Sequence, residues 1–230
     1  MLSHIEERFR VDGRVVSRSM SPGRSDANWK DVGLPSNLCI VGSVNMDEST
    51  QSFSKKVLDR SFVIEFSDID LSAVGSVTPG QKPAAWSAKD WEQRYLTLAE
   101  YPDRTAPFVA EVIEALVAIN ECLEPAQLQV GYRVRDEIVL FCANARACVS
   151  GFTTLEEAGV DPLDLAISMK ILPRIQGSGA VVGAALERLN KWAAPAATGA
   201  EPKSTFPYSA ERLGIMLKRL RSAGFTSYWL

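Results

Sequence analysis

The chain has 230 residues, 46% hydrophobic and 23% charged, which suits a globular protein of one large domain or two small ones. The formal net charge of −3 gives no overall electrostatic case for nucleic-acid binding, and no apolar run reaches the roughly 18 to 20 residues of a membrane span. A single histidine, His4, and four cysteines without CxxC spacing argue against a Ser-His-Asp triad or a His-rich metal site and favour buried free thiols.

The N-terminal stretch predicts the end of a helix and then a hairpin. MLSHIEERFR carries acidic residues early and lacks the apolar stretch of a secretion signal, so we expect a cytoplasmic protein. Residues 1–8 are typical of a helix end, and the Asp-Gly pair in FRVDGRVV lies between short β-prone runs, which predicts a tight hairpin. Arginines crowd this hairpin at positions 8, 10, 14 and 18. Either a solvated loop or a nucleic-acid or partner contact through Arg10 and Arg14 explains them.

Two apolar segments in the first third of the chain predict strands. NLCIVGS (37–43) is short, β-branched and continuous, as in a buried strand, and SFVIEF (61–66) has the same character. Residues 52–59 between them have a helical pattern. Residues 72–84, rich in Gly, Pro and small residues, are predicted to form a linker. Two parallel strands do not make a stable sheet alone, so this region is expected to be part of a larger α/β domain.

Downstream of the linker the hydrophobic periodicity is helical almost throughout. Apolar stripes occur at helical spacing in residues 109–117, 134–149 and 213–220. The Asp161-Pro162 pair predicts the start of another helix, because Asp is a good capping residue and Pro suits the first helical position. Residues 195–207 predict a second linker.

Asn45 and Arg60 lie at the two ends of the short predicted helix. Ligands of open α/β sheets bind beyond the carboxyl ends of strands, where a carboxamide can hold a phosphate or an attacking water. At ~1.5 Å per residue, the helix puts Arg60 on the order of 15 Å from Asn45, too far for one nucleotide to touch both easily. We therefore predict that Asn45 serves the chain's own site and Arg60 a neighbour's, as an arginine finger. A turn role for Asn45 and a carboxylate partner for Arg60 are the ordinary alternatives.

The stretch LPSNLCIVGSVNMDESTQSFSKKVLDRSFVIEF resembles the sensor 1 to arginine-finger segment of AAA+ NTPases. More narrowly, it resembles the McrB-type restriction ATPase/GTPase family, in which a "GT.N" strand end is followed by "L.R.F". GYRVRDEIVLF is similar to the first helix of that family's lid, and DLAISMKILPRIQG and KRLRSAGFTSYW resemble further lid sequences. The resemblance implies that Asn45 is sensor 1, that Arg60 is a finger acting in trans, and that Arg135 is the sensor 2 contact to the γ-phosphate.

The implied fold is an α/β remnant, the C-terminal half of an AAA+ P-loop NTPase core, followed by an all-α lid, with helices dominating overall. Its implied divisions are residues 1–72 for the half core, 73–108 for a linker or insert and 109–230 for the lid. The family's phosphate loop and acidic Mg²⁺-binding strand precede sensor 1, and residues 1–36 contain neither. In GSVTPGQKP, Gln81 stands where a phosphate loop has Lys. A truncated gene, a mis-called start or a split protein would each explain the difference.

The resemblance implies a part of a McrB-like AAA+ NTPase that drives DNA restriction or remodelling when completed by its missing half or by neighbouring subunits. ATP or GTP with Mg²⁺ is the expected cofactor of the complete protein, while this chain alone is expected to be inactive, to bind no nucleotide tightly and to hold no metal. The implied partners are like AAA+ subunits in a ring, a McrC-like nuclease and DNA through the assembly, without a membrane. The alternative is a non-enzymatic helical adaptor that docks on AAA+ rings and donates Arg60.

Overall fold

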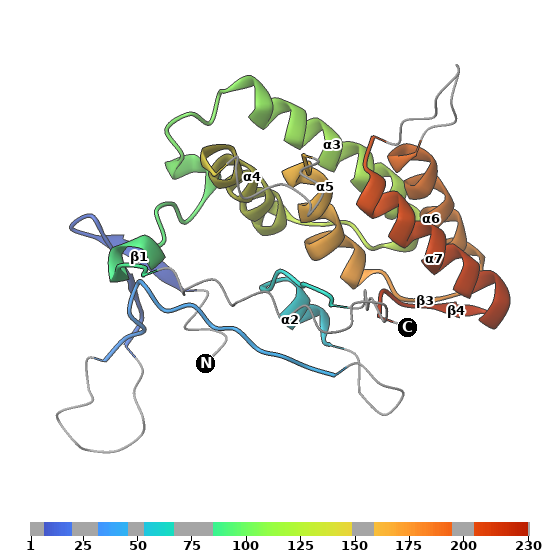
Figure 1. The fold of residues 1–230 in the computed structure, drawn as a ribbon, viewed down its shortest axis with the longest axis horizontal. Helices are drawn as coiled ribbons and strands as arrows, with labels where there is room; N and C mark the ends of the chain where they lie inside the picture. Colours follow the sequence, from blue (N-terminus) through green and yellow to red (C-terminus); the bar gives the residue numbers. More distant parts are fainter. Residues whose placement is uncertain are drawn as a thin grey trace, which may run out of the picture. The chain divides into compact units, whose positions relative to one another are not determined.

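The computed structural model describes residues 7–19, 32–45, 53–66, 85–148, 159–194 and 205–229. The chain divides into two compact units, one of residues 1–44 with 66–96 and one of residues 45–65 with 97–230. Helices dominate the described residues, as expected (Figure 1). The linker predicted at 72–84, the one at 195–207 up to residue 204, and the first six residues of the N-terminal helix end lie outside the described residues.

The first unit contains the predicted hairpin. β1 (Arg8–Val11) pairs antiparallel with β2 (Arg14–Ser17). Asp12 and Gly13 form the turn with φ angles of 48° and 79°. Positive φ at both central residues is the type I′ geometry, whose twist matches that of the paired strands. The Asp-Gly pair predicted this turn correctly because the conformation is decided locally. The same unit holds a short 3-10 helix, η2 (Ala88–Trp91).

The strands predicted at 37–43 and 61–66 are not strands in the structure. Several of their apolar side chains are exposed, with Val41 at 88% and Phe66 at 92%. Strand geometry requires a ladder of hydrogen bonds to a neighbouring strand, and the sheets in the described part of the chain pair only β1 with β2 and β3 with β4. The hydrophobic pattern reports the character of the side chains and cannot report whether a partner strand is present.

The second unit is helical. Its elements in chain order are α2 (Lys55–Leu58), η3 (Leu98–Glu100), α3 (Pro107–Leu123), η4 (Glu124–Ala126), α4 (Tyr132–Ala147), α5 (Pro162–Ala166), η6 (Ile167–Ile171), η7 (Leu172–Arg174), β3 (Gly177–Ser178), α6 (Gly179–Ala193), α7 (Pro207–Ala223) and β4 (Phe225–Thr226). The helical stripes correspond to α3, α4 and α7. η6 is a π-helix that continues α5 directly. No helix in the described ranges is long and apolar enough to cross a membrane.

The predicted start of α5 is confirmed. The Asp161 side chain accepts a hydrogen bond from the backbone N–H of Leu163 at 2.8 Å, and Pro162 occupies the first helical position. The first N–H groups of a helix have no partner within the helix, so a short acidic side chain just before it satisfies one of them. Proline loses nothing at this position because its missing N–H would be unpaired anyway.

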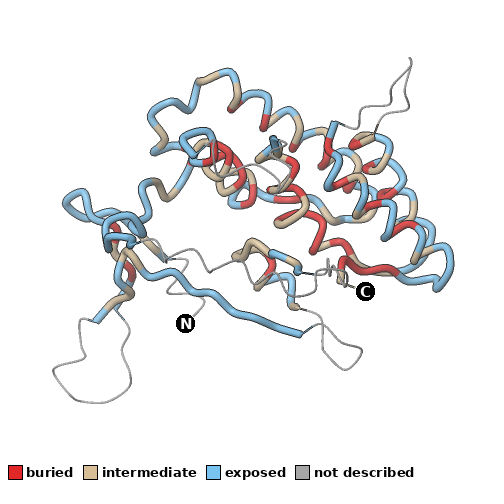
Figure 2. Tube along the Cα trace, in the orientation of Figure 1, coloured by how far each residue is buried: buried red, intermediate tan, exposed pale blue. Residues whose placement is uncertain are grey.

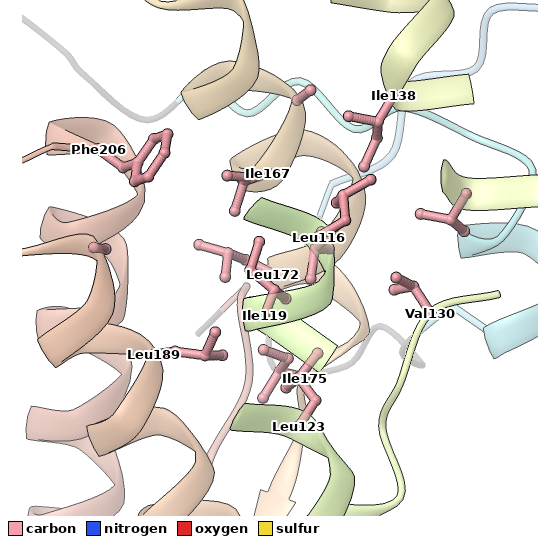
Figure 3. Packing of buried hydrophobic residues seen from close by; sticks show 14 of the residues in the cluster. Leu116, Ile119, Leu123, Val130, Ile138, Ile167, Leu172, Ile175, Leu189 and Phe206 are labelled. Atoms are coloured by element: carbon pink, nitrogen blue, oxygen red, sulfur yellow. The ribbon is translucent and has the colours of Figure 1, made fainter. Parts of the chain in front are cut away.

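One hydrophobic core joins the helices of the second unit. Buried residues lie on the sides of α3, α4, α6 and α7 that face one another (Figure 2). Ile119 of α3, Ile138 of α4, Leu186 of α6 and Met216 of α7 are each 0% exposed. Figure 3 shows part of this cluster around Ile119. Burial of one such side chain contributes about 1.5 to 3 kcal/mol, so the helical unit has an ample source of stability.

A buried carboxylate connects α5 to the start of α7. Asp164 is 0% exposed. Its Oδ2 accepts from the backbone N–H of Tyr208 at 2.8 Å and its Oδ1 from that of Ser209 at 2.9 Å. The Ser209 hydroxyl donates in return to the Asp164 carbonyl at 3.2 Å. A negative charge at a helix N-terminus is favourable, and here it comes from another helix.

Candidate functional site

Arg60 lies in a turn directly after α2. The helix predicted at 52–59 is confirmed over Lys55–Leu58, while residues 46–52 lie outside the described residues. Leu58 is 4% exposed and anchors α2. The Arg60 guanidinium donates a hydrogen bond through Nη1 to the Lys56 carbonyl one turn earlier. The backbone of this turn therefore decides where the guanidinium can reach.

A buried lysine binds the turn. The Lys170 side chain is 0% exposed, and its Nζ donates to the backbone carbonyls of Asp59 at 2.9 Å and Ser61 at 3.1 Å. Nζ also forms an ion pair with Glu137 of α4. An ammonium group has three donors and no acceptor, and these three oxygens match that number. A buried ammonium without such partners would cost several kcal/mol.

Further contacts hold the turn on the same surface. Arg174 Nη2 lies 3.2 Å from Asp59 Oδ1. The Phe62 ring centroid is 4.8 Å from Lys170 Nζ, and the ring stacks on Phe141 of α4 with a centroid separation of 5.3 Å. A cation over an aromatic face is attracted by the electron density of the ring. Residues 59–62 are thus held on the helical unit by a side-chain ion pair and ring contacts as well as by hydrogen bonds to their backbone.

The extended part of the segment continues along the helical unit. The Val63 backbone N–H donates to the Met169 carbonyl at 3.0 Å. Glu65 forms an ion pair with Arg212 of α7. Met169 and Lys170 both lie in the π-helix η6, a rare wide helical turn that is frequent at functional sites. η6 therefore presents two of the groups that bind residues 59–63.

Burial and the neighbouring charges have opposing effects on the pKa of Lys170. Burial lowers the pKa of Lys170 from its ordinary value, because desolvation penalises the charged form. The nearby carboxylates of Glu137 and Asp59 oppose this shift, and the Arg174 guanidinium adds to it. Burying the charged lysine therefore costs free energy, and its specific partners offset that cost.

Arg135, the predicted sensor 2 residue, lies in the first turn of α4. Its Nε and Nη2 donate to Asp136 Oδ1 at 2.8 and 2.6 Å, and its guanidinium carbon lies 5.0 Å from the centroid of the Tyr132 ring. Asp136 Oδ2 in turn accepts from the Leu98 backbone N–H at 3.1 Å. About a third of the Arg135 side chain is exposed. Arg135 is two residues from Glu137, so α4 carries both the predicted nucleotide contact and the carboxylate partner of Lys170.

Asn45, the predicted sensor 1 residue, is exposed at the start of the second unit and directly precedes residues outside the described ranges. The hydrogen bonds that Lys170 donates to the Arg60 turn go to the carbonyls of Asp59 and Ser61. Its role at the chain's own nucleotide site stays a prediction.

The two hairpin arginines differ in their surroundings. Arg10 donates through Nη1 to the Gly13 carbonyl at 3.0 Å and through Nη2 to the Arg94 carbonyl at 2.8 Å. Its guanidinium therefore stabilises the turn and joins the hairpin to residues near η2. Arg14 is exposed. A contact of either arginine with nucleic acid or a partner stays a prediction.

Two open cavities lie elsewhere on the helical unit. One of about 500 Å³ lies between α6 and α7 and is lined by Asn190, Leu217 and Lys218 among others. Another of about 420 Å³ is lined by Tyr101, Phe108 and other residues. Neither includes Asn45, Arg60 or Arg135. In the ranges that the structure describes, no group of three or more His, Cys, Asp or Glu residues is placed to hold a metal ion.

Reasoning from the sequence missed Lys170, Glu137 and Arg174. The available signal was Lys170 itself, a charged residue between Met169 and Ile171 in a largely apolar run. Such a lysine is almost never fully buried unless it is paired. Its partners near Asp59 and Ser61 are 111 and 109 residues away in the chain, and no local pattern reports them.

Residues 81–225 match a family model described as a domain of unknown function, DUF8727. The matched range covers more than half of the chain and contains Glu137, Lys170 and Arg135, whereas Asn45 and Arg60 precede it. Comparison with curated proteins and with solved structures finds no match.

Proposed function

The chain belongs to the DUF8727 family, a domain of unknown function, and we propose that it is part of a McrB-like AAA+ assembly in which Arg60 acts as an arginine finger at a neighbouring subunit's nucleotide site. One observation carries the proposal: Lys170, buried in the helical unit, binds the carbonyls on both sides of Arg60. A finger stabilises charge that develops in the transition state, and this requires a guanidinium whose position is set in advance.

The chemistry of Arg60 suits this role. Arginine offers a planar fork of donors that matches phosphate oxygens. The Arg60 hydrogen bond to the Lys56 carbonyl lies within a single helical turn. In the proposed assembly, a phosphate oxygen would replace that carbonyl as the acceptor. The turn is short and follows α2 directly, so the side chain begins from a supported backbone.

In the proposed assembly, the missing half of the fold or neighbouring subunits supply the remaining parts of the catalytic centre. The sequence contains no G-x-x-x-x-G-K-[ST] segment to cradle the β- and γ-phosphates. In the complete assembly, Mg²⁺ and ATP or GTP would bind at such a loop, where Asn45 would orient the attacking water and Arg135 would contact the γ-phosphate. The assembly is a cytoplasmic ring of like subunits that works with a McrC-like nuclease on DNA.

The hairpin is the proposed contact with DNA or with a partner protein. Because Arg10 supports the turn, Arg14 is the better residue to test. Arg14→Glu is expected to weaken DNA-dependent hydrolysis by the assembly while the association of its subunits is unchanged. Unchanged DNA-dependent hydrolysis in this variant would remove the hairpin from the proposal.

The finger role is tested by complementation. An intact McrB-like subunit, one with a phosphate loop, has its own finger arginine replaced by alanine, and its ATP and GTP hydrolysis is measured with Mg²⁺ and increasing amounts of this chain. A finger typically contributes ~10³ to 10⁵ in rate, so the chain is expected to restore a large part of that factor. Arg60→Ala should restore none, and Arg188→Ala, at an exposed position on α6, should behave as the unaltered chain.

Two results would contradict the proposal: no stimulation by the unaltered chain, or equal stimulation by the Arg60→Ala variant. Stimulation that survives the loss of Arg60 would instead indicate an adaptor that acts by docking alone.

A further inference from the structure

We propose that Lys170 is the positioning residue for Arg60. It fixes the backbone on both sides of the arginine to the helical unit, and this sets where the Arg60 guanidinium lies relative to that unit. The proposal rests on the proposed function, in which Arg60 is a finger.

The hydrogen bonds of Lys170 bracket Arg60. Nζ binds the carbonyl of the residue before Arg60 at 2.9 Å and that of the residue after it at 3.1 Å. One atom therefore fixes the orientation of two carbonyl groups, those of the residues directly before and after Arg60. The backbone torsions at Arg60 lie within that bracket, and they decide the direction in which its side chain leaves the chain.

The ammonium group is itself held by a rigid element. Its ion-pair partner Glu137 lies on α4 next to Ile138 and Val139, each 0% exposed in the core. The Val63 hydrogen bond to Met169 adds a second attachment from the same π-helix. The position of the Arg60 turn is thus set by contacts with α4 and η6 rather than by its own short helix, α2.

Stability alone does not account for a lysine at this position. Taking an ammonium out of water costs several kcal/mol, and replacing both partners of a buried ion pair by well-packed apolar residues of similar volume is often neutral or stabilising. Methionine would fill much of the same volume without that cost. What methionine cannot do is donate to two carbonyls, and these carbonyls belong to the residues on each side of Arg60.

The experiment uses the full chain and the substitution Lys170→Met. Native-state amide hydrogen exchange reports the attachment of the segment through the Val63 N–H, with amides of α3 as the internal reference. Hydrogen bonds to a charged group contribute enough that we expect at least about tenfold faster exchange at Val63, with α3 unchanged. Lys170→Arg, which keeps the charge and the donors, should recover part of the protection. Lys218→Met, at an exposed position on α7, should exchange as the unaltered chain.

A second readout separates positioning from binding. In the complementation assay the Lys170→Met chain is expected to lower the maximal hydrolysis rate by at least about tenfold, a substantial part of the factor a finger supplies. The chain concentration that gives half-maximal stimulation should stay the same, because the docking surface is intact. Lys170→Arg should again recover part of the rate.

Each outcome decides the proposal. Unchanged exchange at Val63, or faster exchange with an unchanged maximal rate, would overturn it. If Lys170→Met unfolds the helical unit, Glu137→Gln replaces it, since this variant retains Lys170 and its carbonyl bonds but weakens their support. Faster exchange confined to Val63 in that variant supports the proposal, and a uniform loss of protection across the unit overturns it. Amide hydrogen exchange at Val63 is measured without nucleotide hydrolysis. If the unaltered chain fails to stimulate hydrolysis, the finger role is refuted, but the exchange experiment still shows whether Lys170 attaches the segment.

Discussion

Replacement of Asp164 by asparagine is expected to destabilise the helical unit far more than its small change in shape suggests. Asp164 is fully buried and accepts from two N–H groups at the start of α7, one on each carboxylate oxygen. Asparagine has one carbonyl oxygen and one NH₂ group. It can therefore accept from one of these backbone groups and must place its own donor against the other.

The cost has three sources. One hydrogen bond is lost and leaves a buried N–H without a partner, a penalty of about 1 to 3 kcal/mol. The other bond becomes neutral, and a bond to a charged group is worth roughly 1 kcal/mol more than a neutral one. The charge at the helix N-terminus contributes a further ~0.3 to 1 kcal/mol. Together these predict a loss of about 3 kcal/mol, which corresponds to about 6 to 12 °C in Tm for a unit of this size.

The assay is urea unfolding followed by circular dichroism at neutral pH. Asp161→Asn is the matched control, because Asp161 also accepts at a helix start but from an exposed position, and asparagine caps a helix about as well as aspartate. The control should lose only a few tenths of a kcal/mol. Free energies of unfolding for the two variants within about 0.5 kcal/mol of each other would refute the reasoning.

Three further predictions concern burial. Burial raises the pKa of the Cys142 thiol to about 12, so iodoacetamide at mildly alkaline pH should label exposed Cys39 and spare Cys142; equal labelling would contradict this. The pKa of Lys170 is lower in the folded chain than its ordinary 10.5, so the unfolded chain binds more protons at pH values between the two. The free energy of unfolding should therefore increase as the pH rises through that window. Lys170→Met should lack that contribution, and identical pH slopes in urea unfolding would argue against it. Leu116→Ala should cost about 2 to 5 kcal/mol because Leu116 is 4% exposed, whereas Val117→Ala, beside it at 52%, should stay within about 0.5 kcal/mol by the same measurement.

Local features of the chain could be predicted from the sequence because local interactions decide them. The Asp12-Gly13 turn needs only residues that accept positive φ, and the start of α5 needs only a capping side chain and a proline. The helical stripes of α3, α4 and α7 follow from the spacing of apolar residues along one element. The segment at 37–43 differs because a strand requires a neighbouring strand, which the apolar pattern of one segment cannot supply.

The most informative polar contacts lay beyond such reasoning for the same reason. Asp164 binds backbone groups 44 and 45 residues further along the chain. Lys170 binds carbonyls more than 100 residues earlier, and its partner Glu137 lies on another helix. In both cases a charged residue among apolar neighbours indicates a buried partner, but only the fold identifies that partner. The place of Arg60 after a predicted helix led to the finger prediction, whereas the contacts that hold its backbone are evident only in the structure.

The most direct test of the finger role is the association of this chain with the finger-less McrB-like subunit in two nucleotide states. A finger binds the transition state better than the ground state, so the chain should bind at least about tenfold more tightly to the subunit loaded with ADP, aluminium fluoride and Mg²⁺ than to the subunit with ADP and Mg²⁺. Arg60→Ala should abolish that difference while binding to the ADP state is unchanged. Equal affinity of the unaltered chain for both states would contradict the assignment of Arg60 as a finger acting in trans.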